Sequence, residues 1–84
     1  MQIERLLDME MSEKEIIKQI GDKIRQLRLE RHLSQFQLQV DADVAKNQVG
    51  RIERGEHVPN IISIIKIAKA LEVDISEIID LKKI

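Results

Sequence analysis

The sequence predicts an all-α fold, and three of its features point to this class. Only three glycines and one proline interrupt the 84 residues. Apolar residues make up 43% of the chain, and their steps of three and four follow the helical period. Although the many isoleucines suit strands by propensity, we weight spacing above propensity. Capping-box patterns, in which a Ser or Asp precedes a Glu or Gln by three positions, mark helix starts at Ser12, Ser34 and Asp74.

The first helix is predicted from Ser12 to about Arg31. Its apolar residues step by four, four and three along one face, and they are Ile16, Ile20, Ile24 and Leu27. Gly21 lies inside this helix, where glycine costs roughly 1 kcal/mol relative to alanine. We therefore expect that the missing side chain at Gly21 lets another helix approach closely.

Two short helices are predicted next, joined by a turn at Asp43-Val44. The first begins after Ser34, and the second runs from about Lys46 to Arg54. Gly55 is a natural C-terminal stop for the second helix. Helical spacing turns four apolar residues of this pair inward, namely Leu38, Ala42, Val49 and Ile52.

Two further helices are predicted after the loop at residues 57–60. Asn60 caps the fourth helix, and Asp74 caps a fifth that carries Ile75, Ile78 and Ile79. The predicted core stripe of the fourth helix consists of Ile61, Ile64, Ile65, Ala68 and Leu71. We divide the chain into an N-terminal extension, residues 1–15, and a helical domain, residues 16–84. The extension is either one more amphipathic helical segment or a frayed arm.

Composition excludes several classes of function. The chain has no Cys, which removes disulfides and thiolate catalysis and argues against a structural zinc site. His32 and His57 alone supply too few ligands for a metal site. There is no glycine-rich phosphate loop, and we expect no enzymatic activity and no cofactor. No apolar run approaches the roughly 20 residues of a membrane span, so we expect a cytoplasmic protein.

The segment 46–51 carries side chains suited to nucleic acid. A small protein can insert one helix of a closely joined pair into the DNA major groove. Arg51 could grip a guanine and Asn47 could pair with an adenine, while Gly50 would let the helix backbone approach DNA closely. The alternative is a surface helix with ordinary solvated charges, and spacing alone leaves both open. The predicted base-contacting residues are Lys46, Asn47, Gln48 and Arg51.

Charge distribution favours the same segment. The net charge of −1 argues mildly against a nucleic-acid binder. Residues 20–54 hold seven Lys or Arg and five Asp or Glu, a net charge of +2. The rest of the chain holds seven against ten, a net charge of −3, so the positive balance lies on the segment proposed to meet DNA.

Two sequence motifs about sixteen residues apart are, in combination, specific enough to indicate a protein family. They are Leu33-Ser34-Gln35 and Arg51-Ile52-Glu53-Arg54-Gly55. With them, residues 20–79 resemble the helix-turn-helix family of Cro and the lambdoid phage repressors, often called the Xre family. This resemblance implies a five-helix lambda-repressor-like domain that binds double-stranded DNA, usually as a dimer on a two-fold operator.

The resemblance also implies roles for single residues. Gln35 and Arg54 match positions near the DNA backbone, and Gly50 joins them in our predicted backbone-contacting set. Arg28 and Glu53 match a partly buried ion pair between the first and third helices. The chain departs from the family at four positions. Asp43 and Glu72 stand where Gly is common, Ala45 replaces a capping Ser or Thr, and Gln39 replaces a small residue.

Apolar residues that such a small core cannot easily bury predict an interface between subunits. We expect a homodimer through Ile62, Leu81 and Ile84, in the fourth helix and at the C-terminus. The leading hypothesis is a sequence-specific DNA-binding transcriptional regulator, most simply a repressor. One alternative is an antitoxin or other protein-interaction module that binds a toxin or another protein through residues 1–15, with DNA binding as autoregulation. Another is the controller protein of a restriction-modification system.

Overall fold

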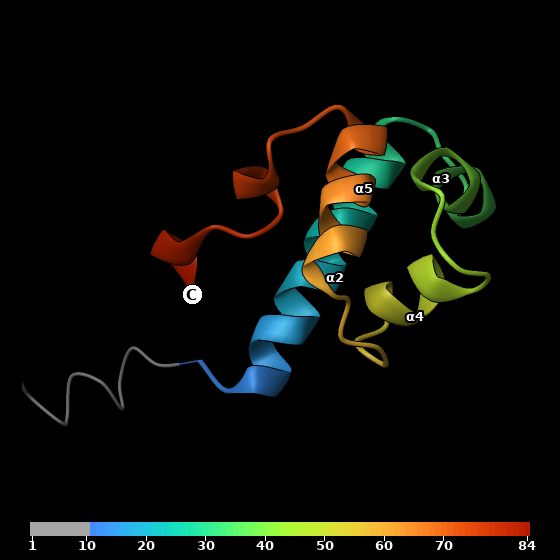
Figure 1. Cartoon of the computed structure of the whole chain (residues 1–84). Coiled ribbons are helices and arrows are strands. Elements are labelled where there is room, and N and C mark those ends of the chain that lie inside the picture. The colour runs from blue at the N-terminus through green and yellow to red at the C-terminus, as the bar shows by residue number, and fades with distance from the viewer. Residues whose placement is uncertain (1–10) are drawn as a thin grey trace, which may run out of the picture.

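The regular secondary structure of the described residues is entirely helical. The computed structural model covers residues 11–84 in a form that can be described, and these residues include no strand. The long helix α2 (Glu13–Glu30) runs behind α5 (Ile61–Leu71), with α3 (Gln35–Ala42) and α4 (Gln48–Glu53) together on one side (Figure 1). Two 3₁₀ turns, η1 (Ile75–Glu77) and η2 (Leu81–Lys83), follow α5 on the other side. The predicted all-α fold class is confirmed.

Capping side chains start three of the α-helices, α2, α3 and α5, where the sequence predicted. The hydroxyl of Ser12 accepts from the Glu15 backbone N–H at 3.1 Å, and that of Ser34 accepts from Gln37 at 2.9 Å. Asn60 Oδ1 accepts from the backbone N–H of Ser63 at 2.8 Å. Each bond satisfies one of the backbone donors that a helix leaves free at its N-terminus. The predicted helix starts are therefore fixed by local chemistry.

The predicted fifth helix is only a single 3₁₀ turn, η1. Asp74 caps this turn by accepting from the Ser76 N–H at 3.2 Å. Asp80 then accepts from the Lys82 N–H at 3.0 Å and starts a separate turn, η2. Because a second cap follows so soon, the segment between the two aspartates is too short for a longer helix.

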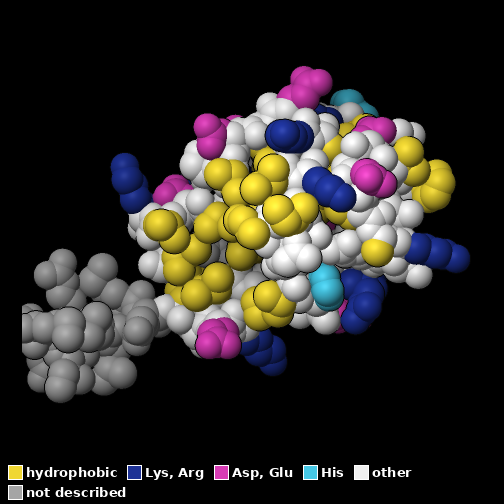
Figure 2. Space-filling model, viewed as in Figure 1, with side chains coloured by type: hydrophobic (Ala, Val, Ile, Leu, Met, Phe, Trp, Pro, Cys, Tyr) yellow, Lys and Arg dark blue, Asp and Glu magenta, His cyan; other side chains and the backbone are white. Residues whose placement is uncertain are grey.

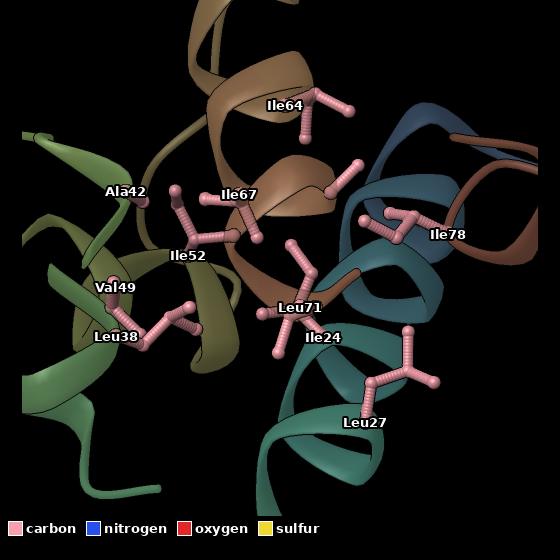
Figure 3. Packing of buried hydrophobic residues seen from close by; sticks show 11 residues of the cluster. Ile24, Leu27, Leu38, Ala42, Val49, Ile52, Ile64, Ile67, Leu71 and Ile78 are labelled. Carbon is pink, nitrogen blue, oxygen red and sulfur yellow. The ribbon is translucent and has the colours of Figure 1, made fainter. Parts of the chain in front are cut away.

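One hydrophobic core joins the four α-helices and the segment after α5 (Figure 3). The predicted inward positions of α3 and α4 are confirmed as buried. The core stripe predicted for α5 was partly wrong, because Ile61 and Ile65 are exposed and Ile67 is fully buried. Both sets follow helical spacing, and the packing of α5 against α3 and the rest of the core selects the stripe that contains Ile67. The buried hydrophobic residues are Ile24, Leu27, Leu38, Ala42, Val49, Ile52, Ile64, Ile67, Ala68, Leu71 and Ile78.

Gly21 is the point where α2 and α4 meet most closely. A Cβ atom built at Gly21 would lie 2.2 Å from the carbonyl oxygen of Ile52 and 3.1 Å from Cα of Glu53. No real side chain fits at these distances, so the two backbones are in direct contact. The close approach predicted at this glycine is confirmed, and it fixes the position of α4 on the long helix.

The N-terminal extension falls largely outside the described residues. Residues 1–10 are not described, so the proposed partner-binding role of residues 1–15 stays a prediction. The last residues of that range, from Glu13, already belong to α2. Within residues 11–84, none of the helices has the length and apolar character needed to cross a bilayer.

Candidate nucleic-acid interface

A tight turn with two left-handed residues sets the angle between α3 and α4. Asp43 ends α3 with φ 54° and ψ 51°, and its N–H donates toward the carbonyl oxygens of Gln39 and Val40. Asp tolerates this conformation at some steric cost, and glycine would adopt it freely. The Nζ of Lys66 on α5 donates to the Asp43 carbonyl oxygen at 3.2 Å. A surface hydrogen bond from α5 thus also holds this turn.

The start of α4 differs from the prediction. The helix was expected from about Lys46, but Asn47 has φ 64° and ψ 3°, so the helix begins at Gln48. Asn is among the residues that enter the left-handed region most readily, and the Asn47 N–H donates to Gln39 Oε1 at 3.0 Å. Lys46 and Asn47 are exposed on this turn, and Arg51 is exposed one turn further along α4. The edge proposed to contact DNA therefore consists of the turn at Lys46 and Asn47 and of the helix α4.

Gln48 is engaged inside the protein at both ends of its side chain. Its Oε1 accepts from the Ala45 N–H at 3.0 Å, and its Nε2 donates to Ser63 Oγ at 3.0 Å. The first bond is the half of a capping box that a Gln side chain supplies, while the half that a Ser or Thr at position 45 would supply is absent. The second ties α4 to α5. In this conformation Gln48 can contact a base only by giving up these bonds.

Gly50 is covered by the protein's own side chains. A Cβ at this position would lie 3.0 Å from Gln35 Oε1 and 3.0 Å from a guanidinium nitrogen of Arg54. Gly50 is buried beneath these two side chains, and the predicted approach of its backbone to DNA stays a prediction. Its missing side chain makes room for Gln35 and Arg54, the other predicted backbone-contacting residues.

A buried ion pair between Arg28 and Glu53 holds the side chain of Gln35. Arg28 Nε donates to Glu53 Oε2 at 2.7 Å, and a second guanidinium nitrogen donates to Glu53 Oε1 at 3.0 Å. The hydrogen bond to Glu53 raises the pKa of Arg28, against the opposing effect of burial. Gln35 Nε2 donates to the same carboxylate at 3.1 Å, and Arg28 also donates to the Leu33 carbonyl oxygen at 2.8 Å. The pair therefore links α2, the end of α4 and the start of α3.

Basic side chains from α2 extend the surface beyond the predicted residues. A shallow depression beside the start of α3 is lined by Lys18, Asp22, Arg25, Gln35, Glu53 and Arg54. Lys18 pairs with Asp22, and Arg54 pairs with Glu56. Sequence reasoning missed Lys18 and Arg25, although their spacing of seven places them on one face of α2. The depression therefore brings cations of α2 beside the predicted residues Gln35 and Arg54, with Lys18 and Arg54 already paired to carboxylates.

The predicted subunit-contact residues are exposed or partly exposed. Ile62 on α5 is 57% exposed, Leu81 is 79% exposed and Ile84 is partly exposed. Hydrophobic side chains gather over α5 and between it and the C-terminal segment (Figure 2). Ile61 and Ile65, which sequence reasoning assigned to the core, add to this exposed apolar face.

Comparisons with known proteins place this geometry in a family. The Helix-turn-helix family model HTH_3 matches residues 24–78. The structure is similar to that of the restriction-modification controller protein C.AhdI from Aeromonas hydrophila, with 31% identity and a TM-score of 0.72. That alignment covers 74% of this chain and 94% of C.AhdI.

An HTH_3 family transcriptional regulator from Vibrio cholerae is also similar, with 34% identity and a TM-score of 0.76. The alignment covers 80% of this chain but only 38% of that regulator. A search of curated protein sequences found no match. Because the family model covers well over half of the residues, the chain belongs to the helix-turn-helix family HTH_3.

Proposed function

We propose that this chain is a sequence-specific DNA-binding transcriptional regulator. The proposal rests on one observation: the segment from Lys46 to Glu53 has an exposed side and a buried side. Lys46, Asn47 and Arg51 are exposed along one edge. Val49, Gly50, Ile52 and Glu53 are buried, so the exposed edge is held on a rigid support.

The exposed edge carries the chemistry of base recognition. Arg51 can donate to O6 and N7 of a guanine, and Asn47 can pair with N6 and N7 of an adenine. Lys46 supplies a mobile cation beside them. Gln35 and Arg54 would contact phosphates and fix the register of α4 on the duplex. Family membership supports this arrangement of roles.

We propose a homodimer as the DNA-binding form. Two-fold operators place half-sites about 34 Å apart, so two copies must present α4 at that spacing. The exposed apolar face on α5 is the natural contact between copies, since burying it removes apolar surface from water. Ile62→Asp should then produce a monomer in sedimentation analysis, whereas Val40→Asp on α3 should leave the mass unchanged. Equal masses for the two variants at all concentrations would reject the α5 contact.

Repression is the proposed direction of regulation, because a dimer on promoter DNA excludes other proteins by occupancy alone. A second candidate is a restriction-modification controller, which the similarity over 94% of the length of C.AhdI favours. Selected binding sites distinguish the two. A controller would bind upstream of a neighbouring methyltransferase or endonuclease gene, and its deletion would change expression of that gene.

Selection of bound DNA from a random pool tests the proposal. We expect a two-fold symmetric site from the wild type. We expect no enrichment from a triple variant with Lys46, Asn47 and Arg51 changed to Ala. A matched control, Lys82→Ala with Lys83→Ala, removes exposed charge from η2 and should select the same site as the wild type. Enrichment of one sequence by all three proteins would reject the assigned surface.

A further inference from the structure

The single aromatic residue of the chain lies exposed beside the proposed DNA-contacting edge. Phe36, in the first turn of α3, is 68% exposed. It borders a groove between α3 and α4. Burying a Phe side chain stabilises a protein by roughly 1.5–3 kcal/mol, so leaving it in water forgoes that gain. The residues lining the groove are Gln35, Phe36, Gln39, Lys46, Asn47, Val49 and Gly50.

Two glutamines that line this groove each have one end of the side-chain amide engaged within the protein. Gln39 Oε1 accepts from the Asn47 N–H at 3.0 Å, and Gln35 Nε2 donates to Glu53 at 3.1 Å. Val49 contributes an apolar side chain, and Gly50 has no side chain. The groove therefore combines apolar atoms and an aromatic edge with the polar ends of Lys46, Asn47 and the two glutamines.

Such a groove matches one chemical group of the DNA major groove. The C5 methyl of thymine is the apolar group that base pairs present there, and Phe is among the residues that contact it. We propose that Phe36 reads a thymine methyl next to the bases contacted by Lys46 and Asn47. This inference rests on the proposed function and adds a specificity-determining residue on α3.

The test removes the methyl group and the ring separately. Each thymine of the selected half-site is replaced in turn by deoxyuridine, which lacks the methyl but keeps the hydrogen-bonding edge. Wild-type protein should lose about fourfold in affinity at one position, as expected for one buried methyl. Phe36→Ala should bind more weakly and show no further loss at that position. Because Phe36 is exposed, Ala at this site should keep the thermal unfolding midpoint close to that of the wild type.

Val40→Ala provides the matched control. Val40 lies one turn further along α3 and is 54% exposed, but it does not line the groove. This variant should keep the wild-type sensitivity to deoxyuridine. Specific DNA binding with no deoxyuridine effect in the wild type, or an equal effect in Phe36→Ala, overturns the role of Phe36 and leaves the proposed function standing. Absence of specific DNA binding by the wild type overturns both.

Discussion

Arg28 and Glu53 are joined by paired hydrogen bonds of 2.7 and 3.0 Å, with only 8% and 2% of their side chains exposed. The two residues are 25 positions apart, on α2 and at the end of α4. Glu53 also holds Gln35, so the pair connects the long helix to both elements of the proposed DNA-binding surface. The hydrogen bond to Glu53 raises the pKa of Arg28, which favours the charged form of the guanidinium in this pair.

We predict that Arg28→Met destabilises the protein by about 3–5 kcal/mol, because it leaves a buried carboxylate without its cation. Urea unfolding measures this change. Arg28→Met with Glu53→Leu removes both charges and should recover most of the loss. Arg25→Ala, on an exposed position of α2, should change stability by less than about 0.5 kcal/mol. A loss in Arg28→Met no larger than in Arg25→Ala would contradict the structural importance of the pair.

Gly21→Ala should be strongly destabilising even though alanine is the better helix former. The added Cβ would lie 2.2 Å from the Ile52 carbonyl oxygen, which forces α2 and α4 apart. Overpacking of this kind costs about 1–3 kcal/mol, more than the roughly 1 kcal/mol gained in helix propensity. Thermal unfolding gives the comparison, with Lys14→Ala on the exposed face of α2 as the control. A stabilised Gly21→Ala variant would show that the two backbones are not in contact.

The bond between Gln48 and Ser63 should be detectable as a coupling energy. Gln48→Ala loses both the contact to Ser63 and the cap on the Ala45 N–H, and we expect a cost of about 1–2 kcal/mol. Ser63→Ala loses one bond and should cost less. A double-mutant cycle in urea should give a coupling of at least about 0.5 kcal/mol. Additive effects would mean that Gln48 is free to contact bases.

Glu72→Gly should stabilise the protein. Glu72 ends α5 with φ 58° and ψ 42°, a conformation that costs a side-chain-bearing residue roughly 1 kcal/mol relative to glycine. The control Lys69→Gly lies inside α5, where glycine should cost about 1 kcal/mol. Unfolding midpoints that shift in the same direction for both variants would contradict the left-handed end of α5.

Local chemistry explains why most of the fold was predictable. Ser12, Ser34 and Asn60 cap their helices through their own side chains, so short sequence patterns locate the helix starts. The choice between Ile65 and Ile67 as core residues was not predictable in this way. Both follow the helical period, and only the packing of α5 against other helices separates them.

The candidate site was predictable in its residues but not in their geometry. The Asn47 backbone adopts the left-handed conformation, and its N–H donates to Gln39 Oε1 on α3. The helix α4 therefore begins at Gln48, later than predicted. Gln48 and Gly50 were assigned to DNA from their sequence position, but their partners, Ser63 and Gln35, come from other helices. Contacts over such separations leave no local signal in the chain.

The most direct test of the account is a fluorescence titration of selected DNA with wild-type protein and Arg51→Ala. If Arg51 grips a guanine, its loss should cost about 1–3 kcal/mol and relax preference at one base pair of each half-site. Wild-type affinity should also fall steeply with salt, since phosphate contacts release counterions. Unchanged affinity and unchanged base preference in Arg51→Ala would contradict the placement of α4 in the major groove.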